Sequence, residues 1–465
     1  MTRYRIPQHH LNRRNLMMGA AGAAGVGAFG ISRMAPALAQ DTVNLQFWTP
    51  GGSTTFCDGF TEIGAAYEAV VGNVHIESVT CGVGDQSFDE MFLAAIAAGN
   101  PPDATIVWSS PIAYAVNGAL QPLDDWMANS RYSQVENWPA NVLASCQIDG
   151  QTYGLPVAAG TYAMIYNQEL FEEVGLPSGR DEFPKTWDEL RAASAAITQW
   201  DGDTLVRMGM MPPQQNVEFP IWVATNGSQI YDAETFTYNL NSPEAIETLT
   251  AFVAWLDEEY RGDLIAVNLA NNWTENVVES RPPTFQNGLL GMMGNGFWIT
   301  GEYYNQVAPE APAVERWDVA SYPIGPSGTA TASGYWPNWA VVPSGAAHPE
   351  EAFGYIDYIG GPEGMEIWFE KIPDLPTNAN VPLMVPPKLE EMRGAEVASS
   401  ITEFFRSQLE VAIPMWTSPV QNFANDQIQR AIDQAYAHQG EPADLLATAQ
   451  EACQAELDRV MASRS

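Results

Sequence analysis

One segment near the middle of the chain, Asp149–Asn167, constrains the fold more than any other. Its first part, Asp149–Pro156, is typical of a tight turn and a short strand, because Asp-Gly favours a reversal and proline cannot donate to a strand ladder. Its last part, Tyr162–Asn167, is apolar and aromatic and has the length of a strand. The small residues Ala158–Gly160 lie between them and tolerate backbone rotation at low cost. We therefore predict a strand that crosses between two lobes.

The chain before this segment alternates strands with helices. Val43–Trp48 and Val74–Val79 alternate apolar and polar residues, and Pro102–Trp108 is typical of a buried strand. Helical patterns over about 56–71 and 88–99 lie between these strands. This order predicts an α/β fold with a doubly wound parallel sheet, whose ligands bind beyond the carboxyl ends of the strands. At 465 residues, 46% of them hydrophobic and 16% charged, the chain is long enough for two or three globular domains.

The first forty residues differ in composition from the rest. They hold five of the twenty basic residues and no acidic one, and they continue into an apolar Gly/Ala run, Gly19–Ile31, and then Ala37-Leu38-Ala39. We expect a cleaved signal peptide over residues 1–39, with Arg13-Arg14 typical of twin-arginine export. The apolar run is short and glycine-rich for a membrane anchor. No cysteine follows the cleavage site, so we expect a soluble periplasmic protein without a lipid anchor.

Strong acidity excludes one class of partner. Without the first forty residues, 15 basic residues face 56 acidic ones, a formal charge of 15 − 56 = −41. Such a surface repels phosphate groups, so we expect no nucleic-acid binding. It is compatible with a saline habitat, where salt screens the self-repulsion, but it names no ligand.

The cysteines and histidines predict disulfide chemistry rather than a metal site. Cys57, Cys81, Cys146 and Cys453 allow three pairings in an exported protein. Cys57–Cys81 closes a short loop and is the first candidate, with a stabilisation of about 3 kcal/mol. The chain has no Cys-x-x-Cys motif, and the histidines outside the predicted signal peptide, His75, His348 and His438, are far apart, so we predict no metal and no cofactor.

Six motifs follow one another over almost all of the mature length: Gly99–Asp103, Asn117–Asp124, Asp149–Pro156, Tyr166–Leu176, Thr186–Leu190 and Phe285–Trp298. In this order they resemble the extracellular solute-binding proteins of family 1, the maltose-binding-protein-like sugar-binding components of ABC importers. This resemblance implies a periplasmic-binding-protein fold, with two lobes joined by three crossing hinge strands and a ligand cleft that closes by hinge bending. Lobe 1 would be residues 41–157 with about 338–374, and lobe 2 would be 158–337 with about 375–465.

The resemblance also implies partners and a site. It implies a sugar or polyol ligand, the permease subunits of an ABC transporter, a monomer and no enzymatic activity. A sugar has apolar faces and a rim of hydroxyls, so its site needs aromatic planes beside hydrogen-bonding groups. Trp298 is the strongest candidate, because it matches the family's aromatic after the Gly-x-Trp turn. The other candidates for ligand binding are Trp48, Gly52, Ser53, Trp108, Ser109, Ser110, Thr161, Tyr162, Trp222, Tyr335, Trp336 and Trp416.

Two departures from the family pattern leave the sugar open. Ser109-Ser110 occupies a loop with polar sugar contacts in maltose-binding protein, but the Asp of that loop is missing. Gly160 stands where an acidic ligand contact would align. Both departures argue against a maltose-like ligand. Glu218, which shares a helix face with Trp222, is a further candidate for the cleft.

Two other functions remain as alternatives. A secreted carbohydrate-active enzyme would need two carboxylates about 5 to 10 Å apart across the bound sugar. No carboxylate stands in a distinctive motif, although a chain this acidic does not exclude the pair. The same fold would instead bind a polyamine or another cation if carboxylates and tryptophan faces held it.

Overall fold

The computed structural model describes residues 42–50, 54–80, 85–270, 285, 287–300, 314–371 and 374–463. All structure given below belongs to the unit that begins at Thr42. The predicted signal peptide, Gly52, Ser53 and Cys81 lie outside the described residues.

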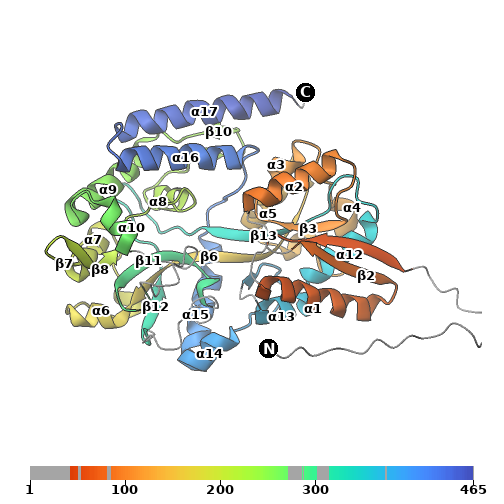
Figure 1. Cartoon of the computed structure of the whole chain (residues 1–465), viewed down its shortest axis with the longest axis horizontal. Helices are drawn as coiled ribbons and strands as arrows, with labels where there is room; N and C mark the ends of the chain where they lie inside the picture. Colours follow the sequence, from red (N-terminus) through yellow and green to blue (C-terminus); the bar gives the residue numbers. More distant parts are fainter. Residues whose placement is uncertain are drawn as a thin grey trace, which may run out of the picture. The chain divides into compact units, whose positions relative to one another are not determined.

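The first three strands of the described chain form one part of the sheet, and helices connect them. Strands β1 (Val43–Trp48), β2 (Val74–Thr80) and β3 (Ala104–Val107) are parallel and lie in the order β2-β1-β3. Helices α1 (Thr54–Val71) and α2 (Asp85–Ala97) connect them, as the sequence predicts (Figure 1). Because parallel strands end at one edge of a sheet, Trp48, the last residue of β1, and Trp108, the first residue after β3, lie at the same edge.

Strand β6 (Leu155–Asn167) is the centre of the fold, and all thirteen of its residues are buried. Its first part pairs with β13 (Tyr335–Val341) and β14 (Leu375–Pro376), and its second part pairs with β11 (Leu290–Gly296) and β12 (Trp317–Ala320). The predicted crossing strand is confirmed, because one strand serves both parts of the sheet (Figure 1).

Helices cover the second part of the sheet (Figure 1). Strand β11 is parallel to β8 (Thr204–Met210), and β7 (Gln199–Asp201) pairs with β8. Helix α7 (Trp187–Ile197) begins with the predicted capping box, in which Thr186 accepts from the Glu189 backbone and Glu189 reaches back. The remaining helices of this part that carry the argument below are α8 (Phe219–Thr225), α9 (Pro243–Tyr260), α16 (Gln421–Tyr436) and α17 (Pro442–Ala462).

Other elements pack around these. Helix α1 contacts α12 (Pro349–Ile359) and α13 (Pro362–Lys371), and α9 contacts both α16 and α17. The shorter elements include α3 (Pro111–Ala115), α4 (Asp124–Met127), α5 (Ala140–Leu143), β4 (Gln147–Ile148), β5 (Gln151–Thr152), α6 (Gln168–Glu173), β9 (Tyr231–Asp232), β10 (Thr237–Tyr238), α10 (Leu264–Ala270), α14 (Pro387–Arg393) and α15 (Ala395–Ser407).

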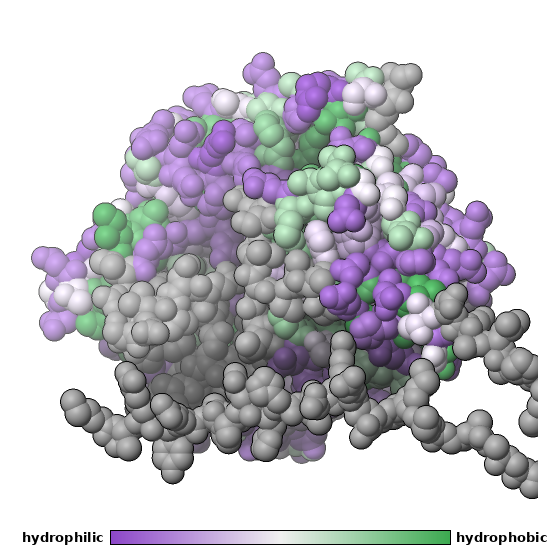
Figure 2. Space-filling view, turned by 45° about the vertical axis from the view of Figure 1, so that its right-hand side comes forward, coloured by the Kyte–Doolittle hydropathy of each residue, from purple (hydrophilic) through white to green (hydrophobic). Residues whose placement is uncertain are grey.

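The described surface is largely polar on the face that Figure 2 draws. On the face drawn in Figure 2, hydrophilic residues dominate the described surface, and hydrophobic areas are small and scattered. None of the helices that the structure describes is long and apolar enough to cross a membrane. Within the same residues, no group of three or more His, Cys, Asp or Glu side chains is placed to hold a metal ion.

The cysteines fall into two groups. Cys57 is disulfide-bonded, whereas Cys146 and Cys453 are buried free thiols. Burial raises the pKa of both thiols, that of Cys453 to about 12, so both stay protonated and unreactive at neutral pH. Cys81 is outside the described residues, so its pairing with Cys57 stays a prediction.

We expect alkylation to modify two cysteines in the unfolded, unreduced protein. Denaturant exposes Cys146 and Cys453, while the Cys57 sulfur stays in its disulfide. Peptide mapping by mass spectrometry after iodoacetamide treatment, with and without reduction, measures this. Alkylation of Cys57 without reduction would contradict the assignment.

Candidate functional site

The indole ring of Trp298 lies on the backbone of two glycines. A Cβ atom on Gly160 in β6 would overlap Trp298 Cε3, and one on Gly296 at the end of β11 would overlap Trp298 Cζ3. Gly296 pairs with Tyr162, whose ring meets Trp298 edge-on with centroids 5.3 Å apart. We call Gly160, Tyr162, Gly296 and Trp298 the Trp298 platform.

Trp336 extends this aromatic surface. It lies opposite Gly160 in the β13–β6 ladder, so its side chain leaves the sheet on the face that carries the platform. Its ring contacts that of Trp416, with centroids 4.8 Å apart. The Trp298 and Trp336 rings are only partly buried, so both rings can contact a ligand.

Trp416 has an unusual backbone. Its φ of 64° is in the left-handed region, which bulky side chains seldom adopt and which often marks functional sites. Its Nε1 donates to Tyr335 O at 2.8 Å, which fixes the indole beside Trp336.

Two further tryptophans stand at the carboxyl ends of the parallel strands. Trp108 Nε1 donates to Asn338 Oδ1 at 2.8 Å, and Asn338 Nδ2 donates to Asp374 Oδ2 at 2.9 Å. Asn338 is two residues beyond Trp336 in β13, so this network lies on the same face of the sheet. Trp48 is partly buried, and its Nε1 has no hydrogen-bond partner in the described chain. Both residues remain candidates for ligand contact.

The serines after Trp108 bind protein groups. Ser109 Oγ donates to Asp89, and Asn422 Nδ2 donates to Ser109 Oγ at 3.1 Å. Burial raises the pKa of Asp89, although hydrogen bonds from Ser109, Tyr114 and Asn422 to its carboxylate oppose the shift. Ser110 is fully buried and its Oγ donates to Trp416 O at 2.6 Å. These serines therefore tie the β3–α3 loop to the segment that begins α16.

Three predicted contact residues are not brought to the platform. Thr161 Oγ1 donates to Phe405 O at 2.7 Å, and Tyr335 OH donates to Asn141 O at 3.0 Å. Both have 0% exposure and alternate with platform-side neighbours, so they point to the opposite face. Trp222 is 1% exposed and packs against Trp187, Phe252 and Tyr322 in the core. All three side chains are therefore buried in the protein core and do not contact the platform face.

Glu218 lies beside the strands that carry the platform. It precedes α8, and its Oε1 is 3.3 Å from the position that a Cβ on Gly294 would take. Gly294 pairs with Met164 in β6, two residues from Tyr162 on the same face. Burial alone raises the pKa of Glu218 to about 8. Helix α8 begins after Glu218, so Glu218 does not share a helix face with Trp222, which packs in the core.

Stability should fall as the pH rises, in part through Glu218. The folded protein holds this proton up to about pH 8, whereas an unfolded glutamate releases it near its ordinary pKa of 4.5. The stabilising contribution is therefore complete below about pH 4.5 and is lost as the pH rises through about 8. We expect Glu218→Gln to gain melting temperature relative to the parent between about pH 5 and pH 9. A difference that stays constant across this range would contradict the shift.

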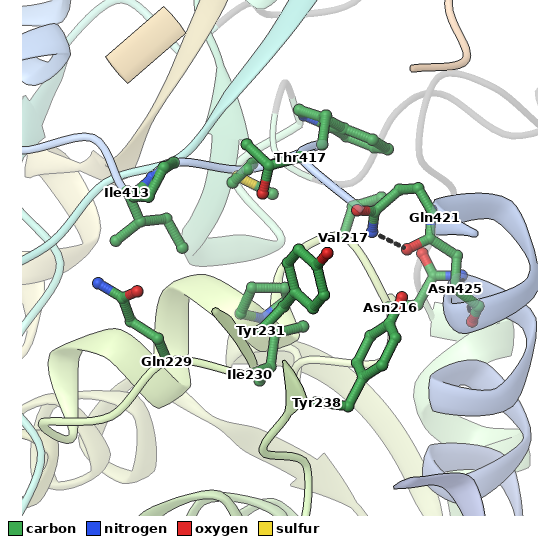
Figure 3. Close-up of a pocket in the computed structure, with 14 residues that line it drawn as sticks. Asn216, Val217, Gln229, Ile230, Tyr231, Tyr238, Ile413, Thr417, Gln421 and Asn425 are labelled. Carbon is green, nitrogen blue, oxygen red and sulfur yellow. Dashed lines mark hydrogen bonds between the residues drawn. The ribbon is translucent and has the colours of Figure 1, made fainter. Parts of the chain in front are cut away.

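A pocket with about 530 Å³ of empty space, part of it open to solvent, adjoins Trp416 (Figure 3). Amides, hydroxyls and apolar groups line it, and none of the lining side chains is charged. Gln421 Nε2 donates to Asn425 Oδ1 at 3.0 Å, as the dashed line shows (Figure 3). The lining residues are Asn216, Val217, Pro220, Gln229, Ile230, Tyr231, Tyr238, Ile413, Pro414, Met415, Trp416, Thr417, Gln421 and Asn425.

The pocket was not predicted from the sequence apart from Trp416. Its walls come from residues near 216, 230, 238 and 413–425, which only the fold brings together. The signal was weak: Gln421, Asn422 and Asn425 give an amide-rich helix start. With the platform, the site offers aromatic faces and neutral hydrogen-bonding groups. This chemistry suits an uncharged molecule with apolar faces and hydroxyls.

Relatives by sequence cover part of the chain. A binding protein of Brucella abortus (strain 2308) is 28% identical over 268 residues, 57% of this chain and 59% of its own length. The arabinooligosaccharide-binding protein of Halalkalibacterium halodurans is 23% identical over 265 residues, 53% of this chain and 54% of its own length. The chain thus spans little more than half the length of these curated relatives.

Solved structures share the fold. CpMnBP1 with mannotriose bound superposes with a TM-score of 0.70 at 21% identity, covering 89% of this chain and 100% of that chain. Maltose-bound MalE3 of T. maritima gives 0.68 at 20% identity, covering 90% and 99%. These likenesses show the two-lobed periplasmic-binding-protein fold. The family model of the bacterial extracellular solute-binding proteins matches residues 57–366. The chain therefore belongs to the bacterial extracellular solute-binding proteins.

Proposed function

We propose that this protein is the substrate-binding component of an ABC importer and binds a neutral carbohydrate or polyol in the cleft between its lobes. The observation that carries the proposal is the Trp298 platform, on which an indole ring lies over bare glycine backbone beside Trp336. Aromatic planes of this kind contact the apolar faces of sugars. The mannotriose, maltose and arabinooligosaccharide named for the relatives agree with this ligand class.

The lobes are proposed as predicted, 41–157 with about 338–374, and 158–337 with about 375–465. The change of partners along β6 supports this division, because residues up to Thr161 pair with β13 and β14 and later residues pair with β11 and β12. Ligand binding then shifts the protein toward a closed state, through contacts made only there.

The cellular setting follows from the same proposal. The protein is exported by its twin-arginine signal peptide, acts in the periplasm as a monomer without a lipid anchor, and delivers its ligand to the permease subunits. It carries out no reaction on the ligand. Trp416 lines a second pocket and its ring contacts that of Trp336. If a ligand spans the platform and this pocket, oligosaccharides bind more tightly than their monosaccharides, and this is the result we expect.

A thermal-shift panel tests the proposal. The mature protein is heated with mannobiose, mannotriose, maltose, maltotriose, arabinooligosaccharides, mannitol and spermidine. A ligand that binds only the folded state at about 100 times its Kd stabilises that state by about 2.7 kcal/mol. A saturable rise in Tm with one neutral sugar class supports the proposal.

The alternatives predict other outcomes. A rise with spermidine alone would support a cation-binding protein. The favourable observations are the acidic surface and the carboxyl group of Glu218, which forms no ion pair within the described ranges. Release of smaller sugars from an oligosaccharide, detected by chromatography, would support a carbohydrate-active enzyme.

A further inference from the structure

Glu218 is a half-buried acid that has no hydrogen-bond or ion-pair partner among the described residues. Its side chain makes no hydrogen bond that caps α8, and it forms no ion pair with any residue of the described ranges. The Oε1 atom and the Tyr322 hydroxyl both lie close to the same point, the position of a Cβ on Gly294. The two oxygens are therefore neighbours at the strand beside the platform.

The titratable groups near Glu218 are tyrosine hydroxyls. Tyr322 follows β12 and Tyr436 ends α16, and Tyr162 of β6 lies near Tyr322. After burial, the nearby Glu218 is the main factor that raises the pKa of Tyr322 and Tyr436, which places both close to the carboxyl group. Tyr436 OH is occupied, because it donates to Pro213 O at 2.7 Å. Tyr322 OH is buried and has no partner among the described residues.

This environment favours the neutral acid. An ionised carboxylate needs a cation or several donors when it leaves water, and the part of the chain that the structure describes provides Glu218 with neither. Burial accordingly raises its pKa to about 8. A carboxylic acid has an O–H donor that a carboxylate lacks, so at neutral pH Glu218 can donate as well as accept.

We propose that Glu218 determines ligand specificity: as the neutral acid it donates a hydrogen bond to an oxygen atom of an uncharged sugar seated on the Trp298 platform, beside the Tyr322 hydroxyl. This role rests on the proposed function. A site that presents an O–H donor rejects analogues without the matching oxygen, because the buried donor is then left unpaired. The residue thus selects neutral oxygen-rich ligands over amines in a strongly acidic protein.

The first experiment needs no ligand. The side-chain carboxyl carbons of glutamate are labelled with ¹³C, and the resonance absent from Glu218→Gln identifies Glu218. We expect its titration midpoint near pH 8. A midpoint near 4.5 would overturn the proposal, since the group would then be an anion at neutral pH.

The second experiment measures affinity against pH. Calorimetry with mannotriose, or with the panel sugar that gives the largest Tm shift, is run from about pH 6 to about pH 9.5. Above the pKa of the free protein, affinity should fall about tenfold per pH unit, because binding then requires proton uptake. Glu218→Gln keeps an N–H donor, so we expect about threefold weaker binding without this pH dependence. Glu218→Leu should bind at least about tenfold more weakly at pH 6.

The outcomes separate this proposal from the proposed function. If a neutral sugar binds with the same affinity at every pH, only the role of Glu218 is overturned. Affinity for spermidine that rises with pH and disappears in Glu218→Gln would instead make Glu218 the anion of a cation site. If no panel sugar binds, the proposed function and the role of Glu218 are both overturned. The ¹³C titration midpoint then still shows whether Glu218 is protonated at neutral pH.

Discussion

Trp298→Ala is expected to weaken binding of the panel sugar by about 100-fold or more, which corresponds to about 2.7 kcal/mol. The ring is partly exposed and lies over Gly160 and Gly296, so its removal uncovers bare backbone and takes away the largest apolar face of the site. The Tm of the ligand-free protein should change little. Calorimetric titration and a thermal melt without ligand measure the two effects.

Trp222→Phe is the matched control. This tryptophan is 1% exposed and is surrounded by aromatic rings in the core. The smaller ring leaves a cavity, so the Tm should fall while the affinity stays within a few fold. Retained affinity in Trp298→Ala, or a loss of equal size in Trp222→Phe, would remove Trp298 from the site.

Gly160→Ala should have the next largest effect, a loss of about 10- to 100-fold in affinity. The new Cβ would occupy the position of Trp298 Cε3, so the indole must leave its place on β6. The change adds a single methyl group and no charge. Binding is measured by the same titration.

A double variant tests this cause. In a Trp298→Ala background the Gly160→Ala change meets no ring, so we expect it to alter affinity by less than about twofold. The two changes are thus expected to be strongly non-additive, as residues in contact are. Additive losses would show that Gly160 acts through the backbone of β6 and not through the ring.

The fold could be predicted well, because it depends on patterns that the sequence carries locally. Alternation marks β1 and β2, Thr186 and Glu189 mark the start of α7, and the apolar run after Gly160 marks β6. Trp298 and Trp336 could be proposed because they follow glycines at strand ends or in loops.

The orientation of individual side chains could not be predicted as well. Thr161 and Tyr335 adjoin platform-side residues in sequence, but the β6–β13 register sends both side chains to the other face. The sequence predicts that Glu218 and Trp222 share a helix face, yet α8 begins after Glu218, and only the glutamate lies beside Gly294. Register and helix start are set by long-range packing, which periodicity alone does not contain.

The pocket shows a different limit. Its lining residues are up to about two hundred positions apart and carry no motif. The structural role of Gly160 could not be predicted from the sequence either. The resemblance alone predicts a missing acidic contact there, whereas in the structure the indole ring of Trp298, 138 residues later, lies against Gly160.

The strand order β3-β13-β6 has a consequence for biosynthesis. Strand β13 lies between two strands made much earlier, so the first half of the sheet stays open until residue 341 has left the ribosome. Contacts between segments this distant form slowly, and an unpaired strand edge exposed meanwhile invites aggregation. The nascent chain therefore cannot fold lobe by lobe from its N-terminus, and chaperones that shield the edge of β3 during synthesis would raise the yield of folded protein.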